Sequence, residues 1–344
     1  MNTKPRLLHI ALGNHNQNLK TSLDEVFECK HFDWTAHEGG AHLTAMKLPH
    51  LRRTDALYSE RDRKAINLFN SFKPDYVFLH LQTENIFEPE TIQEMASKAI
   101  IINWTGDVRE GKEMEWYFDF AKLVHSTLFT NKTNVRQFKA QNLNSGYLQV
   151  GYDSTIFNPT RPVPKTKKHD IVFMGSNYGA DRFPLSRQRL FMVEELIIWH
   201  GNRFGLYGTG WGQLADGEMN NCYELENAIY RNSKIGISLS HFDYENYFSD
   251  RLLRIMGSGC FCLSHRYTSI EFDFALGKEI ETFDDFDEMD WKIKYYLKNE
   301  DKRKEIAAAG QKIVSNLFTW KHFAKKLKAK FENISSELHE KTEI

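Results

Sequence analysis

The stretch Tyr244–His265, YENYFSDRLLRIMGSGCFCLSH, places a polar loop, a basic helix start and a glycine-closed strand in direct succession. Ser249 or Asp250 is suited to cap the helix, whose free N–H groups and positive dipole end attract an anion. Arg251 and Arg254 are three residues apart, so both guanidinium groups share one helix face and can clamp a diphosphate. The alternative is a pair of solvated arginines on a surface helix.

The residues after this helix favour the anion site. Gly257 and Gly259 end the helix, and the apolar run Phe261–His265 continues as a short buried strand. The helix therefore runs into the sheet and begins at the opposite edge. In open α/β folds, that edge is where ligands bind.

Composition sets broad limits on the protein. A length of 344 residues predicts two domains, and a net charge of -1 gives no overall field that would attract nucleic acid or membranes. Met1–His9 lacks the apolar core of a signal peptide, and no apolar run approaches the ~20 residues of a membrane span. We therefore expect a soluble, cytoplasmic protein.

The four cysteines fit no zinc-binding spacing. Cys260 and Cys262 share one face of a strand, and two ligands alone do not hold a metal tetrahedrally. We expect buried, reduced thiols, no metal and no cofactor.

Strands and helices alternate along both halves of the chain. We expect one domain over residues 1–160, a second over 161–318 and a C-terminal helix over 319–344 that crosses the boundary between them. A proline-rich, basic stretch, Asn158–His169, serves as the linker. Alternation of this kind predicts an α/β fold with two doubly wound, Rossmann-like domains of mostly parallel strands.

The C-terminal helix carries an apolar stripe beside a lysine-rich face. Such a helix either packs across the boundary between the domains or lies on a membrane surface. The stripe consists of Phe323, Leu327, Phe331, Ile334 and Leu338.

Several motifs, in this order and spacing, resemble the GT-B superfamily of glycosyltransferases, particularly the group 1 type and its spore-maturation-like branch. The motifs of the first half are KPDYVFLHL, IINWTGDVRE and LFTNKTNVRQFKAQNLNSGYLQVGYDSTIFNP. Those of the second half are DIVFMGSN, LYGTGWG, FSDRLLRIMGSGCFCLS and the ending from EIETFDDF to KHFAKKL.

The resemblance implies two domains facing across a cleft, with the acceptor in the first and a nucleotide-sugar donor, UDP- or GDP-linked, in the second. It also implies transfer without a bound metal. Arg254 stands where many group 1 enzymes carry a glutamate that holds donor hydroxyls, and it can supply a second phosphate contact. The other donor residues implied are Gly175 and Ser176 in the first loop, Tyr207 and Gly208 near the nucleoside, and Ser249, Asp250 and Arg251 near the diphosphate.

Glycosyl transfer without a metal needs cationic groups at the leaving diphosphate, and Arg251 is the first candidate. An inverting reaction also needs a base for the acceptor's proton, whereas a retaining one has no such requirement. Asp107, in the turn TGDVR after a strand, is the first candidate base, and its alternative role is to cap that turn. His80 is the second candidate, or else a core histidine.

Two loops of the first half are further candidates. His37 and Glu38 precede a glycine pair in a possible acceptor lid, and Gly13 with Asn14 ends the first strand, where a phosphate or sugar can approach closely. A basic stretch either contacts an acidic acceptor, including nucleic acid, or is a solvated helix face. It comprises Arg52, Arg53, Arg61, Arg63 and Lys64.

The loop Gly208–Gly212 does not fit the dinucleotide fingerprint, because its third glycine falls one residue early. Dehydrogenase chemistry is therefore disfavoured. Trp211, within it, either stacks on a base or sugar or fills an apolar gap.

The sequence thus predicts a glycosyltransferase acting on a hydroxyl acceptor, which is a small molecule, glycan, protein or modified nucleic acid. Two alternatives stay open: an epimerase or hydrolase of the same fold, and a catalytically silent nucleotide- or glycan-binding module. A peripheral membrane contact of the C-terminal helix is less favoured than its packing across the domain boundary.

Overall fold

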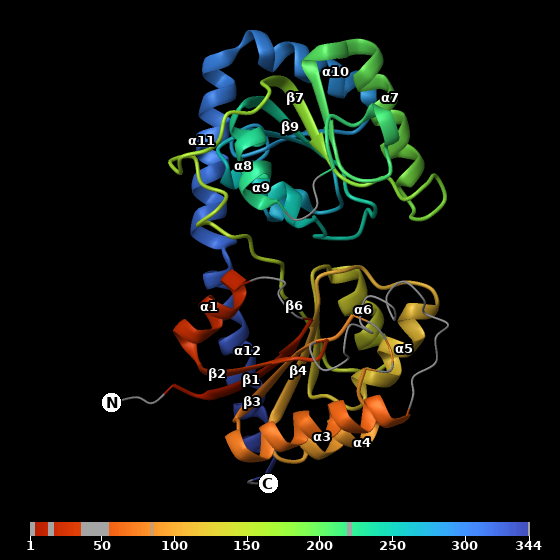
Figure 1. Cartoon of the computed structure of the whole chain (residues 1–344), viewed down its shortest axis with the longest axis vertical. Helices are drawn as coiled ribbons and strands as arrows, with labels where there is room; N and C mark the ends of the chain where they lie inside the picture. The colour runs from red at the N-terminus through yellow and green to blue at the C-terminus, as the bar shows by residue number, and fades with distance from the viewer. Residues whose placement is uncertain are drawn as a thin grey trace. The chain divides into compact units, whose positions relative to one another are not determined.

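A computed structural model describes residues 4–12, 17–35, 55–82, 84, 86–218 and 222–342, without the side chains of 55–59 and 341–342. The chain forms two compact units (Figure 1). The first unit comprises Met1–Gln149 and Phe323–Ile344, and the second comprises Val150–His322. The predicted boundary at residue 160 therefore falls inside the second unit. The reason is local: Tyr152 N donates to Phe318 O at 3.0 Å and so ties the segment to that unit.

The first unit contains one parallel sheet in the order β2-β1-β3-β4-β5-β6. Its strands are β1 (Arg6–Ala11), β2 (Glu28–Asp33), β3 (Tyr76–His80), β4 (Ile100–Thr105), β5 (Ser126–Phe129) and β6 (Ser145–Tyr147). Its helices are α1 (Gln17–Val26), α3 (Asp55–Phe72), α4 (Pro89–Ala96), α5 (Lys112–Ala121), α6 (Lys132–Ala140) and α12 (Trp320–Thr342).

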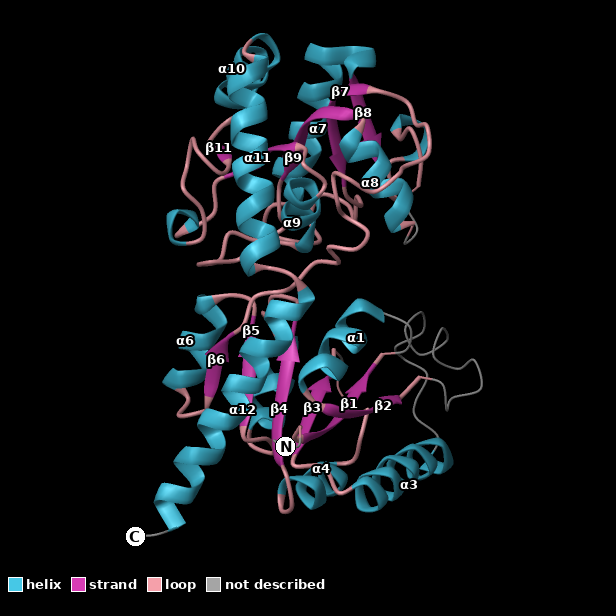
Figure 2. Cartoon of the chain, turned by 90° about the vertical axis from the view of Figure 1, so that its left-hand side faces the viewer, coloured by secondary structure: helices cyan, strands magenta, loops and turns pink. Residues whose placement is uncertain are grey.

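The C-terminal helix α12 covers one face of this sheet (Figure 2). Helices α3 and α4 contribute to the hydrophobic core on the other face. Phe323 lies 5.0 Å from the ring of Trp104, and Phe331 stacks on Tyr76 at 4.6 Å. Phe323, Leu327 and Phe331 are all buried. The apolar stripe of the helix is thus largely occupied by the first unit, which leaves little of it for a membrane surface.

The second unit contains a parallel sheet in the order β11-β10-β9-β7-β8. Its strands are β7 (His169–Met174), β8 (Phe204–Tyr207), β9 (Ser233–Ser238), β10 (Phe261–His265) and β11 (Glu281–Phe283). Its helices are α7 (Ser186–His200), α8 (Tyr223–Arg231), α9 (Asp250–Gly257), α10 (Phe286–Lys298) and α11 (Glu300–Leu317), with short 3-10 turns at Gly201–Arg203, Gly212–Leu214 and Ile270–Phe272.

Alternate residues of β7 face two different cores. Ile171 and Phe173 pack with α7 and α10, whereas Val172 and Met174 pack with α8, α9 and α11. This two-residue alternation is that of a strand buried on both faces. The predicted α/β class with two doubly wound sheets is confirmed. Among the described residues, no helix combines the length and the apolar character needed to cross a bilayer.

Candidate active site

Strand β7 of the second unit pairs with β8 on one side and with β9 on the other. The strand order therefore reverses between β7 and β9. At such a switch point, the two following loops leave the sheet in opposite directions and open a crevice at the carboxyl edge. The loop Gly175–Asn177 follows β7, and Leu239–His241 follows β9.

Two arginines from different helices meet at this switch point. Arg189, on α7, donates from Nη2 to the carbonyl oxygen of Leu239 at 2.7 Å and from Nη1 to that of Ser176 at 3.0 Å. Arg251, in the first turn of α9, donates from Nη1 to the same Leu239 oxygen at 3.3 Å. Both guanidinium groups lie over the ring of Phe173, at 5.5 and 5.4 Å from its centroid.

No described carboxylate forms an ion pair with either of these two arginines. Arg189 is 2% exposed. Burial, and next the positive charge of Arg251, hold the pKa of Arg189 well below its usual range. Two like charges held together without a counter-ion are costly, and an anionic ligand would relieve that cost.

His241 completes the group. Its Nε2 lies 2.6 Å from Arg189 Nη1. Burial, followed by the charges of Arg189 and Arg251, lowers the pKa of His241 to about 3, so the ring is neutral and Nε2 accepts the hydrogen bond. Its ring packs against Phe183 at 4.6 Å and Tyr178 at 5.4 Å, and Tyr178 is 59% exposed. An accessible aromatic side chain therefore adjoins the arginine pair.

Close backbone packing explains the glycines of this edge. A Cβ on Gly175 would lie 2.9 Å from both Arg251 Nη2 and the Phe173 ring. A Cβ on Gly208, whose φ is +131°, would lie 2.5 Å from the Gly175 carbonyl oxygen. The Ser176 hydroxyl accepts from Thr209 at 2.9 Å. These loops can therefore bring backbone close to a ligand.

Two aromatic side chains at this edge form hydrogen bonds within the protein. The Tyr207 hydroxyl lies 2.9 Å from His169 Nε2, so its phenol is engaged with the start of β7. Trp211 is 7% exposed and donates from Nε1 to the Gly175 carbonyl oxygen at 2.6 Å. The structure thus favours the packing role for Trp211.

The structure does not pair Arg254 with Arg251. Arg254 Nη1 lies 3.1 Å from the buried carboxylate of Glu226 on α8, and Nη2 contacts Asp250. Its guanidinium also lies 4.7 Å from the ring centroid of Tyr223. These carboxylates neutralise Arg254, and the residue that lies beside Arg251 is Arg189 instead of the predicted Arg254. Ser249 is the N-cap residue of α9, and its hydroxyl is 3.5 Å from Arg251 Nη1.

Sequence reasoning missed Arg189 and His241. One signal for Arg189 was present: a charged residue on the face of α7 that also carries the buried Met192, Val193 and Leu196. A charge on a buried helix face is uncommon unless it is paired or functional.

In the first unit, Asp107 lies in the turn after β4 and its side chain is 70% exposed. Its backbone N–H donates to the Thr105 hydroxyl at 3.2 Å, and Arg109 Nη2 lies 3.8 Å from its carboxylate. Arg109 is buried and lies 4.5 Å from the Tyr117 ring centroid. This arrangement holds the turn in place and leaves the Asp107 carboxylate accessible.

His80, at the end of β3, contacts the Gln82 side chain and lies 4.8 Å from the ring of Trp104. Gln82, Arg109 and Trp116 help to line a pocket of about 560 Å³ at this edge, which four acidic residues also line. A larger pocket, of about 820 Å³, includes Lys73, Lys98 and His125 at the opposite edge, where the strands begin. The latter lies away from the strand ends at which open α/β sheets bind ligands.

Several predicted residues lie outside the described residues: Gly13, Asn14, His37, Glu38, Arg52 and Arg53. Of the basic stretch, Arg61 is buried and donates to the Ile86 carbonyl oxygen at 2.6 Å. Arg61 therefore belongs to the core of the first unit.

Residues 187–329, including most of the second unit, match the family model described as glycosyl transferase-like. A glycosyltransferase from Rickettsia africae ESF-5 is similar in structure, with a TM-score of 0.63, 12% identity, and coverage of 96% of this chain and 98% of that one. The chain therefore has the GT-B fold.

Two further solved structures are similar to this chain. The Anabaena protein HepE, in complex with UDP and glucose, has a TM-score of 0.62 and 10% identity, covering 96% of this chain and 100% of that one. Sucrose-phosphate synthase from Thermosynechococcus elongatus has a TM-score of 0.63 and 9% identity, covering 97% of this chain and 100% of that one. No curated protein matches the sequence significantly. The spore-maturation-like branch stays a prediction.

Proposed function

We propose that this glycosyltransferase moves a sugar from a UDP-linked donor to a hydroxyl acceptor, and that arginines rather than a metal ion bind the donor diphosphate. One observation carries the proposal: Arg189 and Arg251 converge at the switch point and neither is paired with a described carboxylate. Two fixed positive charges match the two phosphates of a nucleoside diphosphate.

The same pair suits the chemistry of transfer. Negative charge grows on the leaving diphosphate as its bond to the anomeric carbon breaks. Preorganised donors aimed at that charge lower the barrier, because they need little reorganisation during the reaction. The N-terminus of α9, where Asp250 and Arg251 form the first turn, adds a partial positive charge at the same place.

The nucleotide is proposed from similarity. Structures of Anabaena HepE contain UDP, or UDP with glucose, or UDP-glucose. That supports uridine as the first base to test, with GDP as the alternative. Tyr178, which is exposed beside His241, offers a ring for stacking against the donor.

The acceptor is proposed to bind the first unit at the carboxyl edge of its sheet. The pocket beside Gln82, Arg109 and Trp116 has a size of about 560 Å³ and a polar lining. Asp107, whose carboxylate is 70% exposed at the end of β4, is the proposed base for an inverting reaction. His80 is the second choice, because it is engaged with Gln82.

Nucleotide binding tests the proposal directly. We would titrate UDP, GDP, ADP, CDP and dTDP into wild type, Arg189→Gln and Arg251→Gln by calorimetry, with chelator present throughout. Arg187→Gln is the matched control, because Arg187 lies on the same helix and is paired with Asp181 at the surface. We expect selective binding of one nucleotide, weakened in both site variants and retained in the control.

Product analysis then separates the possible reactions. A donor consumed only when an acceptor is present supports transfer, whereas consumption without an acceptor indicates hydrolysis or epimerisation. Selective nucleotide binding with no turnover across an acceptor panel would support the silent binding module. No binding of any nucleotide, or equal binding by the arginine variants, would reject the proposed diphosphate site.

A further inference from the structure

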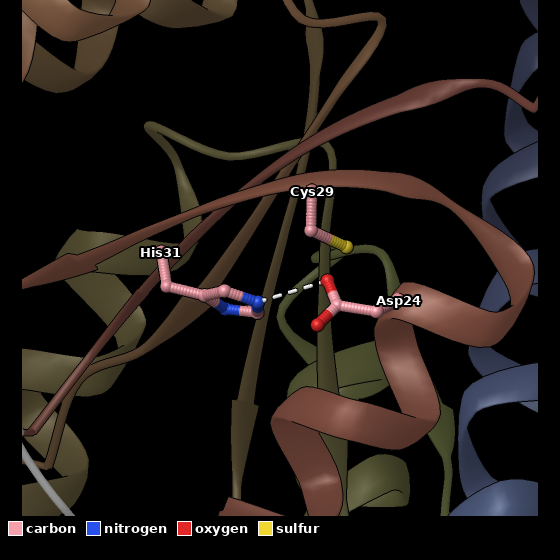
Figure 3. Close-up of side chains that lie close together, drawn as sticks. All are labelled: Asp24, Cys29 and His31. Carbon is pink, nitrogen blue, oxygen red and sulfur yellow. Dashed lines mark hydrogen bonds and ion pairs between the residues drawn. The ribbon is translucent and has the colours of Figure 1, made fainter.

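A second group of polar side chains lies at the edge strand of the first unit, in the cluster Asp24, Cys29 and His31 (Figure 3). Asp24 comes from the last turns of α1, and Cys29 and His31 come from β2. Cys29 and His31 are two residues apart on a strand, so their side chains leave the same face. Figure 3 shows all three side chains directed toward one another, across the gap between helix and strand.

The spacing of this cluster suits a metal ion. One ligand atom from each residue (the Asp24 carboxylate, the Cys29 sulfur, a His31 ring nitrogen) lies within 4.8 Å of the others. His31 Nε2 is 3.1 Å from Asp24 Oδ1. In a tetrahedral zinc site the ligand atoms are separated by roughly 3.3 to 3.5 Å, given ordinary zinc–ligand bond lengths. Only small side-chain adjustments are needed to reach that geometry.

A buried histidine behind the cluster provides an independent observation. His9 Nδ1 lies 3.0 Å from His31 Nδ1, on the ring side opposite Asp24. His9 is 2% exposed, its ring stacks on Phe78 at 5.3 Å, and its Nε2 has no partner among the described residues. Among the described residues, the polar contact of the His9 ring is therefore the one to His31 Nδ1.

The contact between the two histidines admits a tautomer in which His31 Nε2 is available to a metal ion. If His31 Nδ1–H donates to His9 Nδ1, then His31 Nε2 presents a lone pair toward Asp24 and Cys29. A lone pair facing a carboxylate is repulsive unless a cation lies between them. Metal-binding histidines commonly use the far ring nitrogen in this way, with a second group orienting the ring.

We propose that Asp24, Cys29 and His31 bind one zinc ion, with solvent as the fourth ligand and His9 as a positioning residue. Zinc accepts this mixture of sulfur, nitrogen and oxygen ligands. On binding, the Cys29 thiol loses its proton to solvent, and the thiolate and the Asp24 carboxylate together balance the two charges of the ion. The ion would fasten α1 to the edge strand β2.

The proposal departs from the sequence expectation of no metal and buried thiols. Cys29 is only partly buried, and its partners lie close along the chain. The short pattern Cys29-Lys30-His31 resembles no standard zinc motif, because its third ligand comes from the preceding helix. Lys4, the nearby cation, donates to the Asp24 backbone carbonyl at 2.8 Å, which leaves the Asp24 carboxylate to the cluster.

Cobalt substitution tests the site in the full-length protein. After treatment with a chelator and its removal, we expect one equivalent of Co²⁺ to give a thiolate-to-cobalt charge-transfer band, and one equivalent of Zn²⁺ to abolish it. Cys29→Ser should lose the band and weaken zinc binding more than about 100-fold, beyond what changes around a metal site produce. Cys222→Ser is the control, because Cys222 is an exposed free cysteine of the second unit.

Two further variants distinguish a loss of zinc binding from a loss of folding. Asp24→Asn should also weaken zinc binding while keeping the far-ultraviolet circular dichroism of wild type. His9→Phe, which preserves ring packing, should weaken zinc binding about 10- to 100-fold and leave the band and stoichiometry intact. A band that survives Cys29→Ser, or wild type that binds no more zinc than Asp24→Asn, would overturn the site. Unchanged affinity in His9→Phe would remove the positioning role.

Discussion

Arg189 and Arg251 donate to the same carbonyl oxygen, that of Leu239, from two helices on different parts of the second unit, at 2.7 and 3.3 Å. One oxygen cannot neutralise two guanidinium groups. The ligand-free protein therefore keeps a local excess of positive charge where the strand order reverses, and that excess should cost stability in return for anion affinity.

The first prediction follows from this charge excess. Arg251→Gln removes one of two like charges, so the melting temperature of the nucleotide-free protein should stay equal to wild type or rise. Its affinity for UDP should fall roughly 10- to 150-fold, the value of one hydrogen bond to a charged group. Differential scanning fluorimetry and calorimetry measure the two effects. A variant that melts earlier and binds UDP normally would contradict the assignment.

Arg254 should behave in the opposite way. Its side chain and that of Glu226 are 21% and 8% exposed, so Arg254→Met leaves a buried carboxylate without its partner. We expect a loss of about 3–5 kcal/mol in the free energy of unfolding, measured in urea, with nearly unchanged UDP affinity of the folded fraction. Adding Glu226→Leu should restore most of the stability. A stable Arg254→Met protein that has lost UDP would instead assign Arg254 to the diphosphate.

Two glycines of one loop make a matched pair. Gly208→Ala places a Cβ 2.5 Å from the Gly175 carbonyl oxygen at a φ of +131°, so it must displace the loop after β7. We expect a cost of at least about 3 kcal/mol and weaker nucleotide binding. Gly212→Ala, at a φ of +58° with nothing within 4 Å, should cost about 1 kcal/mol from backbone strain alone. Equal unfolding energies for the two variants would show that the close contact is unimportant.

His241 should make stability depend on pH. Its pKa of about 3 lies below the ordinary value of 6.5, because of burial and the charges of Arg189 and Arg251. As pH falls below about 6.5 the unfolded chain takes up this proton first, so stability is full above that pH and declines from there toward pH 3. The slope from this one group is at most about 1.4 kcal/mol per pH unit.

Comparing His241→Phe with wild type isolates the contribution of His241 to the pH dependence of stability, because the other histidines are common to both proteins. Its urea midpoint should fall less steeply between pH 6.5 and 5 than that of wild type. Saturating UDP should also flatten the wild-type slope, since a diphosphate beside the ring favours the protonated form. Parallel slopes in the two proteins would mean that His241 titrates normally.

Asp107→Asn tests the proposed base. We expect kcat to fall about 10²- to 10⁴-fold with unchanged affinity for the nucleotide, since the residue lies in the first unit. Glu94→Gln is the control, because Glu94 lies on α4 of the first unit, outside the proposed acceptor pocket, and its side chain is 42% exposed and paired with Lys98. A kcat within twofold of wild type would remove Asp107 from the chemistry and favour a mechanism without an enzymic base.

The sequence alone determined the α/β class and the alternation of strands and helices, and it predicted a ligand site at one edge of the second sheet. Those features depend on near neighbours: apolar periodicity, glycines after strands and a capped basic helix. Arg251 was found in this way, whereas Gly175, Ser176 and Gly208 were implied by the family resemblance, and all four meet at the switch point.

Only the tertiary structure decided which charges meet. Arg189 and His241 are 52 residues apart in the chain and touch because α7 docks beside the loop after β9. Arg254 pairs with Glu226, 28 residues away in the chain, and not with a ligand site beside Arg251. A carboxylate is buried at low cost only when a cation pairs with it. Local patterns state where a helix begins and which face is apolar, but the partner of a buried charge depends on how distant segments pack.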